Sequence, residues 1–287
     1  MKILFCSDGS QCSLAAFENA VKFIDNAIVD IICVIDWSFL PDTMGMDKNN
    51  FSYIYDNIAD SVLNYSAKMI KKYNFEIGSK IKSFGSPSDA ILETLEDGEY
   101  DLVILGSNGK KGFQKWIGSV SSQVVARTST PCFISKKVLP AKNILITTDG
   151  SECSIGYIKK FTEIINTKDK NITLLTVKES PEYYPVEASM DRNWFDSIEA
   201  EQRAYALKTL NKAKGILNNA KIEIENEVIL TGNAAAEIID YCNKEKIDLI
   251  LLGSRKRNDL SKILLGSVSK RVIENVECTG LVIGCEG

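Results

Sequence analysis

Short apolar runs alternate with helically spaced apolar residues along the whole chain. Ile28 to Ile35 (IVDIICVI) is an almost continuous apolar run rich in β-branched residues, which is typical of a strand covered on both faces. Residues 54–73 then place apolar side chains at helical spacing, and residues 76–84 alternate as a strand does. Strands that alternate with helices in this way indicate a parallel sheet with right-handed crossovers.

The same order of elements is predicted twice, on either side of a linker at 136–141. In the first half we expect strands at 3–6, 28–35, 76–84, 102–105 and 131–135, with helices near 14–24, 54–73, 90–95 and up to about 127. In the second half we expect strands at 143–147, 171–177, 222–230, 248–252 and 280–284, with helices near 153–165, 192–218, 234–245 and 267–276. The sequence therefore predicts two Rossmann-like domains, at residues 1–138 and 142–287.

Three sequence landmarks recur in the same order, which indicates a duplicated domain. Asp8-Gly9-Ser10 returns as Asp149-Gly150-Ser151, at an offset of 141 (149 − 8). The segment DLVILGS at 101–107 returns as DLILLGS at 248–254, and GSVS at 118–121 returns at 266–269. The offset drifts only slightly, to 147 (248 − 101) and 148 (266 − 118), so the insertions between the copies are small.

The repeated loops follow strands, at the edge of the sheet where α/β proteins bind ligands. In the first copy a glycine-rich loop runs from Gly106 to a helix that opens at Gly118-Ser119. Glycines let the backbone approach a ligand closely, and the free N–H groups at a helix start favour an anion. Ser119 is expected either to cap that helix or to donate to a phosphate. The loop is therefore a candidate phosphate cradle.

These motifs together resemble the universal stress protein family, whose loop reads G-x-x-G, nine residues, then G-S/T. The resemblance covers essentially the whole chain as two tandem copies and implies an adenine nucleotide alpha hydrolase-like fold. The ATP-binding members of that family place the triphosphate on this loop, the ribose near the Asp of the early turn, and the adenine against the second strand. The residues implied are Asp8, Val34, Gly106, Gly109, Gly118, Ser119 and Val120 in the first copy, and Asp149, Val177, Gly253, Lys256, Gly266, Ser267 and Val268 in the second.

Each copy departs from the family pattern in its own way. Only eight residues, 110–117, separate Gly109 from Gly118, whereas nine residues, 257–265, separate Lys256 from Gly266. Lys256 stands where the pattern has glycine, so it adds a Cβ where the backbone could need a positive φ. The cations of Arg255-Lys256-Arg257 could offset that loss. Backbone approach is the less replaceable element, which favours the first copy without excluding the second.

The resemblance implies a protein that binds ATP, ADP or AMP, with or without magnesium, in stress response or signalling. The family commonly pairs through its last strand, which here predicts an intramolecular pseudo-dimer through 133–134 and 282–283 and leaves a further homodimer open. No general base is apparent, so any ATP hydrolysis is expected to be slow. The alternative is a scaffold of the same fold that binds no nucleotide and docks a partner.

Composition narrows the chemistry further. The 287 residues include no His, which removes Ser-His-Asp catalysis and His-ligated zinc. The net charge of −4 argues against a nucleic-acid binder. No apolar run approaches the ~20 residues of a membrane span, and the first residues do not resemble a signal peptide. We therefore expect a cytoplasmic protein without nucleic-acid or membrane partners.

Two smaller signals are open to either a structural or a functional interpretation. Asp8 and Asp149 suit an Asx-turn or helix cap as well as a ribose contact. Cys12 and Cys153 occupy equivalent positions at a helix start, where a thiol pKa can fall, so they could be redox-active or simply two copies of one small residue. The aromatic-rich segment 179–200 could cover either a site or a sheet edge.

Overall fold

The computed structural model describes residues 1–36, 48–107, 118–178, 192–256 and 263–284. The first half contains β1 (Lys2–Cys6), α1 (Gln11–Ala20), β2 (Ile28–Ile35), α2 (Lys48–Lys71), β3 (Glu76–Phe84), α3 (Pro87–Asp97), β4 (Leu102–Gly106), α4 (Ser119–Arg127) and β5 (Cys132–Ser135). The second half contains β6 (Asn143–Thr147), α5 (Glu152–Ile164), β7 (Asn171–Lys178), α6 (Arg192–Asn219), β8 (Asn226–Thr231), α7 (Ala234–Lys244), β9 (Leu249–Lys256), β10 (Ile263–Leu264), α8 (Ser267–Asn275) and β11 (Thr279–Gly284).

The predicted order of elements is confirmed apart from one additional short strand, and the other differences lie at element ends. Helix α1 ends at Ala20 rather than near residue 24, because a turn over 21–23 follows it. Strand β8 begins at Asn226 rather than at 222. The short strand β10 was not expected, and it pairs antiparallel with the extended end of β9. A two-residue strand leaves no period in the sequence that could predict it.

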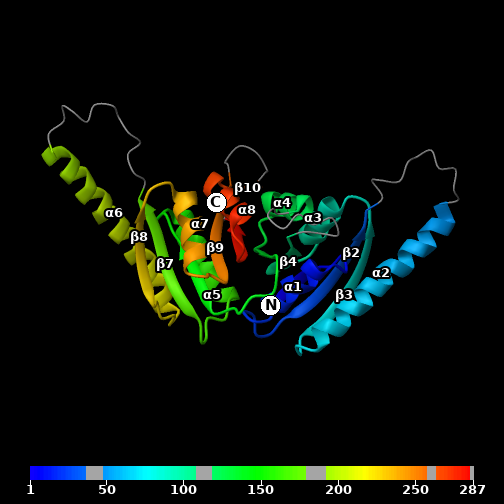
Figure 1. Cartoon of the computed structure of the whole chain (residues 1–287). Coiled ribbons are helices and arrows are strands. Elements are labelled where there is room, and N and C mark those ends of the chain that lie inside the picture. Colours follow the sequence, from blue (N-terminus) through cyan, green and yellow to red (C-terminus); the bar gives the residue numbers. More distant parts are fainter. Residues whose placement is uncertain (37–47, 108–117, 179–191, 257–262, 285–287) are drawn as a thin grey trace.

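The strands of both halves form one sheet, in the order β3-β2-β1-β4-β5-β11-β9-β6-β7-β8. Each half has the same parallel arrangement, and the two halves lie side by side (Figure 1). They meet where β5 pairs antiparallel with β11. Leu281 lies opposite Phe133, and Gly280 lies opposite Ile134. The predicted pairing of the halves through their last strands is therefore present in the structure.

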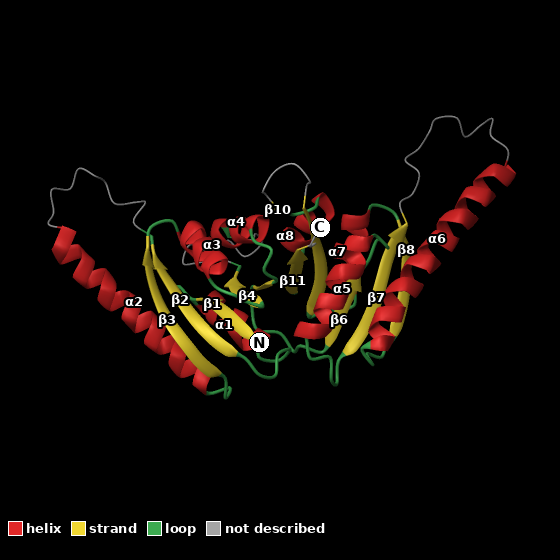
Figure 2. Cartoon of the chain, turned by 180° about the vertical axis from the view of Figure 1, so that it is seen from behind, coloured by secondary structure: helices red, strands yellow, loops and turns green. Residues whose placement is uncertain are grey.

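Helices cover both faces of this sheet (Figure 2). The buried side chains of α1, α2, α5 and α6 pack on one face, with Phe17 and Phe161 fully enclosed. Those of α3, α4, α7 and α8 pack on the other face, around Val124 and Val272. Burial on both faces is why the central strands read as continuous apolar runs in the sequence.

The two copies of the early turn adopt matching conformations. Gly9 and Gly150 both have φ of +75°, a left-handed conformation that favours glycine. The hydroxyl of Ser10 then accepts from the backbone N–H of Ser13, and Ser151 caps α5 in the same way. The repeated Asp-Gly-Ser motif thus specifies a tight turn and a helix N-cap in each half.

A buried polar cluster joins the halves where β5 meets β11. The Asn19 side chain, fully buried in α1, donates to Ser135 Oγ (2.5 Å) and to the Lys137 carbonyl (2.6 Å), and it accepts from the Leu139 backbone (2.9 Å). Ser135 Oγ in turn lies 3.0 Å from the hydroxyl of Thr279 in β11. These bonds tie the first helix and the linker to the central strands.

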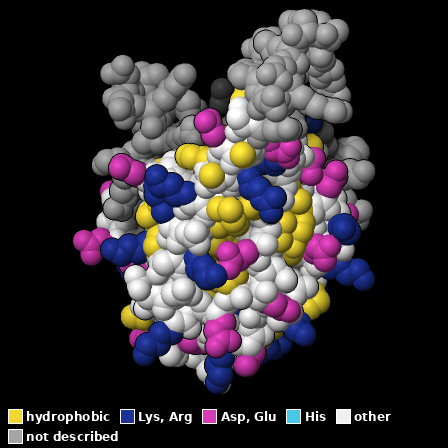
Figure 3. All heavy atoms as spheres, turned by 90° about the vertical axis from the view of Figure 1, so that its left-hand side faces the viewer, with side chains coloured by type: hydrophobic (Ala, Val, Ile, Leu, Met, Phe, Trp, Pro, Cys, Tyr) yellow, Lys and Arg dark blue, Asp and Glu magenta, His cyan; other side chains and the backbone are white. Residues whose placement is uncertain are grey.

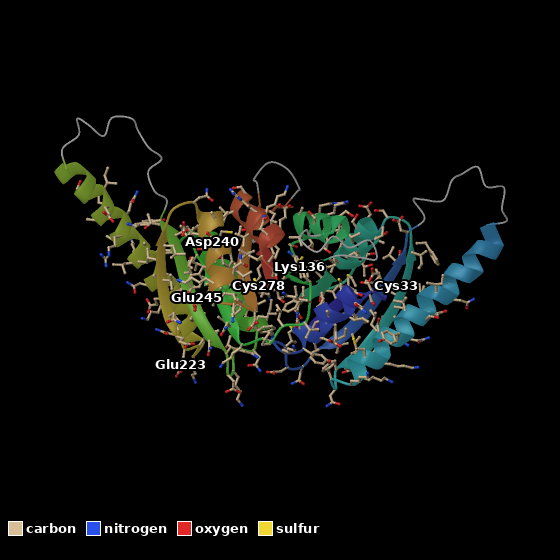
Figure 4. The ribbon with its side chains drawn as sticks, viewed as in Figure 1. Cys33, Lys136, Glu223, Asp240, Glu245 and Cys278 are labelled. Atoms are coloured by element: carbon tan, nitrogen blue, oxygen red, sulfur yellow. The ribbon has the colours of Figure 1, made fainter. Side chains whose placement is uncertain are left out.

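Lys136 anchors the linker at the same junction, close to Cys278 (Figure 4). Its ammonium group donates to the Val276 carbonyl at 2.7 Å. Burial lowers the pKa of Lys136, and the nearby Glu277 acts in the opposite direction. The adjacent Lys137 forms an exposed ion pair with Glu277 at 2.5 Å.

Helices α2 and α6 lie at the two ends of the sheet, where α2 packs on β2 and β3 and α6 packs on β7 (Figure 1). Figure 3 views the end formed by α6 and β8, where side chains of both charge signs alternate around small apolar areas. Tyr205 and Leu207 of α6 are among the exposed large hydrophobic residues. In the part of the chain that is described, no helix is both long and apolar enough to cross a membrane.

Candidate functional site

A cavity of about 870 Å³ lies at the carboxyl ends of the strands in the second half. Its walls come from β6, β7, β9, α5, α6, α7 and the start of α8, and its volume is within the range of small-molecule sites. Six of the residues implied by the resemblance line it together. They are Asp149, Val177, Gly253, Gly266, Ser267 and Val268.

The carboxylates of the early turns have a structural role in both halves. Asp8 Oδ1 accepts from the Ser10 backbone at 2.9 Å, and Asp149 Oδ1 accepts from the Ser151 backbone at 3.0 Å and its hydroxyl at 2.5 Å. Both are therefore Asx-turns, one of the two structural roles expected for them. Asp149 also lines the cavity, so the structural role does not remove it from the site.

The glycines at the ends of β4 and β9 are required by packing. A Cβ on Gly106 would lie 2.7 Å from the backbone nitrogen of Ser13, and a Cβ on Gly253 would lie 2.3 Å from the ring of Tyr157. The sequence had suggested close approach of a ligand at these positions, whereas the first helix of each half approaches them instead. The serines of the GSVS motif add a second link, since Ser121 and Ser269 donate to the carbonyls of these glycines at 2.6 Å.

The start of α8 is suited to an anion. Gly266 is the N-cap of α8, with a φ of −58° that any residue can adopt, and the helix has no side-chain cap hydrogen bond. A Cβ on Gly266 would meet no other atom within 4 Å, although the residue lines the cavity. The first amides of the helix, from Ser267 onward, have no partner within the helix. Neither its φ nor protein packing therefore requires a glycine here, although an N-cap position favours glycine over alanine.

The structure corrects one expectation about Ser119. The N-cap of α4 is Gly118, with no side-chain cap hydrogen bond, and Ser119 is the first helical residue, exposed at the surface. Ser119 therefore does not cap the helix, and Ser267 holds the same place in α8. A glycine N-cap is less common than serine, and this is why the sequence suggested the wrong residue.

Lys256 also departs from expectation. It is the last residue of β9 and pairs with Ile263 of β10, so its backbone is extended and needs no positive φ. The backbone strain that was expected from a lysine in place of glycine at position 256 is therefore absent. Residue 257 lies outside the described residues.

The first half holds its implied residues at equivalent positions. Val34 lies at the end of β2 and is half-buried, and Val120 lies in the first turn of α4. Gly109 lies outside the described residues. Cys6 of β1 holds the position that Thr147 holds in β6, where Thr147 lines the cavity. Burial raises the pKa of the Cys6 thiol well above its usual value.

Several residues of the cavity wall had not been predicted from the sequence. Helix α6 contributes Glu201, Gln202, Tyr205 and Ala206, and α7 contributes Ala234 and Ile238. Their helices were predicted, but which face turns toward the strand ends depends on the tertiary packing. Tyr205 extends its hydroxyl to 3.5 Å from the Asp149 carbonyl, which places α6 beside the early turn.

The charges around the cavity are mixed. Lys178, at the end of β7, pairs with Glu199 of α6 at 3.2 Å, while Asp149 and Glu201 add negative charge to the wall. Among the described residues there is no group of three or more Cys, Asp or Glu arranged to hold a metal ion. The wall therefore combines hydrophobic side chains with a few polar groups, as ligand sites do.

The equivalent cysteines of the two copies differ chemically. Cys12 is a free, half-buried thiol. Cys153 is disulfide-bonded and lines the cavity, with its sulfur 3.7 Å from the Ser254 carbonyl oxygen. The suggestion that both positions share one redox role stays a prediction.

The fold thus defines a tandem α/β protein of two Rossmann-like halves. A sequence model described as the universal stress protein family matches residues 1–136 and again residues 140–284. The chain therefore belongs to the universal stress protein family and carries two copies of its domain. The resemblance seen in the repeated motifs is confirmed.

Individual relatives agree with this assignment. Universal stress protein MJ0531 of Methanocaldococcus jannaschii is 32% identical over 142 residues, 50% of this chain and 81% of that protein. Universal stress protein Slr1230 of Synechocystis is 23% identical over 188 residues, 64% of this chain and 58% of that protein. The crystal structure of a universal stress protein from Archaeoglobus fulgidus superposes with a TM-score of 0.70 at 19% identity, over 99% of this chain and 98% of that one, which shows a shared fold.

Proposed function

We propose that the second half of this protein binds an adenine nucleotide in its 870 Å³ cavity. The observation that carries the proposal is Gly266, a glycine at a helix start that borders the cavity. Neither its φ of −58° nor any neighbouring atom within 4 Å requires a glycine. A ligand that approaches the backbone closely would require one.

The chemistry of the wall is consistent with a nucleotide. The amides at the start of α8 and the helix dipole favour a phosphate group. By the family resemblance, Asp149 would contact the ribose and the β7 backbone at Val177 would border the adenine. Both residues line the same cavity as Gly266, so one ligand could reach all three.

The second half is the better candidate in spite of its altered loop. Lys256 replaces the pattern's second glycine, but it is an extended strand residue, so the replacement needs no strained backbone. The nine-residue spacing from Lys256 to Gly266 is kept. The argument in favour of the first copy, that it keeps its glycines and with them close backbone approach, stays a prediction, because residues 108–117 lie outside those described.

We infer a role in stress response or signalling in the cytoplasm, through nucleotide binding with little or no hydrolysis. Binding without turnover is supported by the Asp149 carboxylate, which already accepts two hydrogen bonds from Ser151 on one oxygen. That oxygen is engaged by the turn and is therefore less available to take a proton from an attacking water.

The test begins with the protein as purified. It is denatured, the released small molecules are identified by mass spectrometry, and the refolded or nucleotide-free protein is titrated with ATP, ADP and AMP by calorimetry, with and without magnesium. We expect binding of at least one adenine nucleotide and, in a parallel assay, negligible phosphate release. No co-purified nucleotide and no heat with any of the three would refute the proposal and favour the scaffold alternative.

A further inference from the structure

Tyr157 has no aromatic counterpart in the first half. The offset of 141 that relates Asp149 to Asp8 places Tyr157 of α5 at the position of Ala16 in α1 (157 − 16). Both residues are on the buried face of the first helix of their half, Ala16 at 0% exposure and Tyr157 at 7%. The two copies therefore differ by a whole aromatic ring at one core position.

The Tyr157 ring lies between α5 and the carboxyl end of β9. In the first half, the backbone of α1 closes directly on the β4 glycine, with Ser13 N 2.7 Å from a Cβ built on Gly106. In the second half, the three atoms nearest a Cβ on Gly253 all belong to the Tyr157 ring, the third at 3.3 Å. The backbone of α5 is thus at least 3.3 Å from that point, because the ring occupies the space.

The ring is also anchored. The Tyr157 hydroxyl donates to the Thr147 carbonyl at the end of β6, a buried hydrogen bond of 2.7 Å. One side chain thereby links α5, β6 and β9 at the edge of the sheet where Thr147 and Gly253 border the cavity. Tyr157 itself forms part of the cavity wall.

We propose that Tyr157 is a positioning residue that keeps the nucleotide cavity open in the second half, and that its absence makes the first half the weaker site. This inference rests on the proposed function. Without the ring, the backbone of α5 can move as close to Gly253 as the backbone of α1 lies to Gly106. This movement would narrow the cavity beside Asp149. Binding sites tolerate displacements of only a fraction of an ångström in their supporting residues.

The experiment compares Tyr157→Ala with Tyr157→Phe in the full chain. Affinity for ATP and AMP is measured by calorimetry at 20 °C, and folding is monitored by circular dichroism and thermal denaturation. We expect Tyr157→Ala to bind at least tenfold more weakly. Tyr157→Phe keeps the ring and loses only the bond to Thr147, so we expect its affinity to stay within about threefold.

Phe161→Ala is the matched control. Phe161 is a fully buried aromatic residue one turn further along α5, and it does not border the cavity. It should lose stability as Tyr157→Ala does and keep its nucleotide affinity. If Tyr157→Ala does not fold, Tyr157→Leu replaces it, with an expected affinity between those of the Phe variant and a tenfold loss.

Three results would overturn the inference. They are unchanged affinity in Tyr157→Ala, an equal loss in Phe161→Ala, and a loss in Tyr157→Phe as large as in the Ala variant. The last would assign the effect to the hydroxyl rather than to the ring. Absence of binding by the wild-type protein would instead reject the proposed function itself, so the two failures are distinguishable.

Discussion

Replacing Asn19 by Leu should destabilise the protein, although Asn19 is far from the cavity. The Leu139 N–H would lose the hydrogen bond that it now donates to Asn19, whereas the Lys137 carbonyl would keep the one that it accepts from Ser135 Oγ at 3.2 Å. One buried polar group left unpaired costs about 1–3 kcal/mol. That is a substantial part of the ~5–15 kcal/mol that stabilises a typical domain.

Urea denaturation followed by circular dichroism measures this change directly. The internal control is Lys160→Leu, since Lys160 is the counterpart of Asn19 in α5 by the offset of 141 (160 − 19). Lys160 is 40% exposed and makes one ion pair, with Glu163, so its loss should cost less than about 1 kcal/mol. Equal effects of the two substitutions, or less than about 0.5 kcal/mol for Asn19→Leu, would show that the junction cluster does not contribute as described.

Three further predictions follow from individual residues. Gly266→Ala should weaken nucleotide binding at least tenfold and cost only about 1 kcal/mol of stability, since its Cβ meets no protein atom and only the N-cap preference for glycine is lost, whereas Gly118→Ala should lose the same N-cap preference and leave binding unaltered in the same titration. Gly150→Ala should cost about 1–3 kcal/mol in urea denaturation, because φ is +75° and the new Cβ would lie 2.5 Å from Thr209, whereas Gly156→Ala in the open middle of α5 should stabilise by about 0.5–1 kcal/mol. Burial and the hydrogen bond to Asp30 raise the pKa of Tyr100, so its contribution to stability is complete below pH 10 and is lost as the pH rises further. Stability measured from pH 9 to 11 should therefore fall less steeply in Tyr100→Phe than in the wild type, and parallel curves would contradict this.

The fold could be predicted from the sequence because the repeated motifs are ones whose side chains form the same local contacts in both halves. Asp101 and Asp248, in the repeated strand motif, accept from the backbone at the start of the neighbouring strand, at Lys2 (2.8 Å) and at Lys142 (2.7 Å). The Asp-Gly-Ser turns and the serines of GSVS likewise form matching contacts in both halves. Each repeated motif therefore has at least one structural reason to be retained.

The candidate site could be predicted only in part. The residues at strand ends and helix starts could be proposed because they lie in short motifs, and Asp149 and Gly266 do border one cavity. Glu201 and Tyr205 were missed, because the orientation of α6 is set by packing and not by a motif. Tyr157 was missed because an aromatic residue on an apolar helix face looks like ordinary core in the sequence.

Photoaffinity labelling with an azido-substituted adenine nucleotide tests the central claim most directly. The full chain is labelled at a nucleotide concentration near the dissociation constant, digested, and mapped by mass spectrometry, with excess unlabelled ATP as the competition control. We predict competable labelling of peptides that contain the cavity wall, such as those around Val177, Tyr205 or Val268. Competable labelling confined to residues 1–136 would contradict the account, because it would place the nucleotide in the first half.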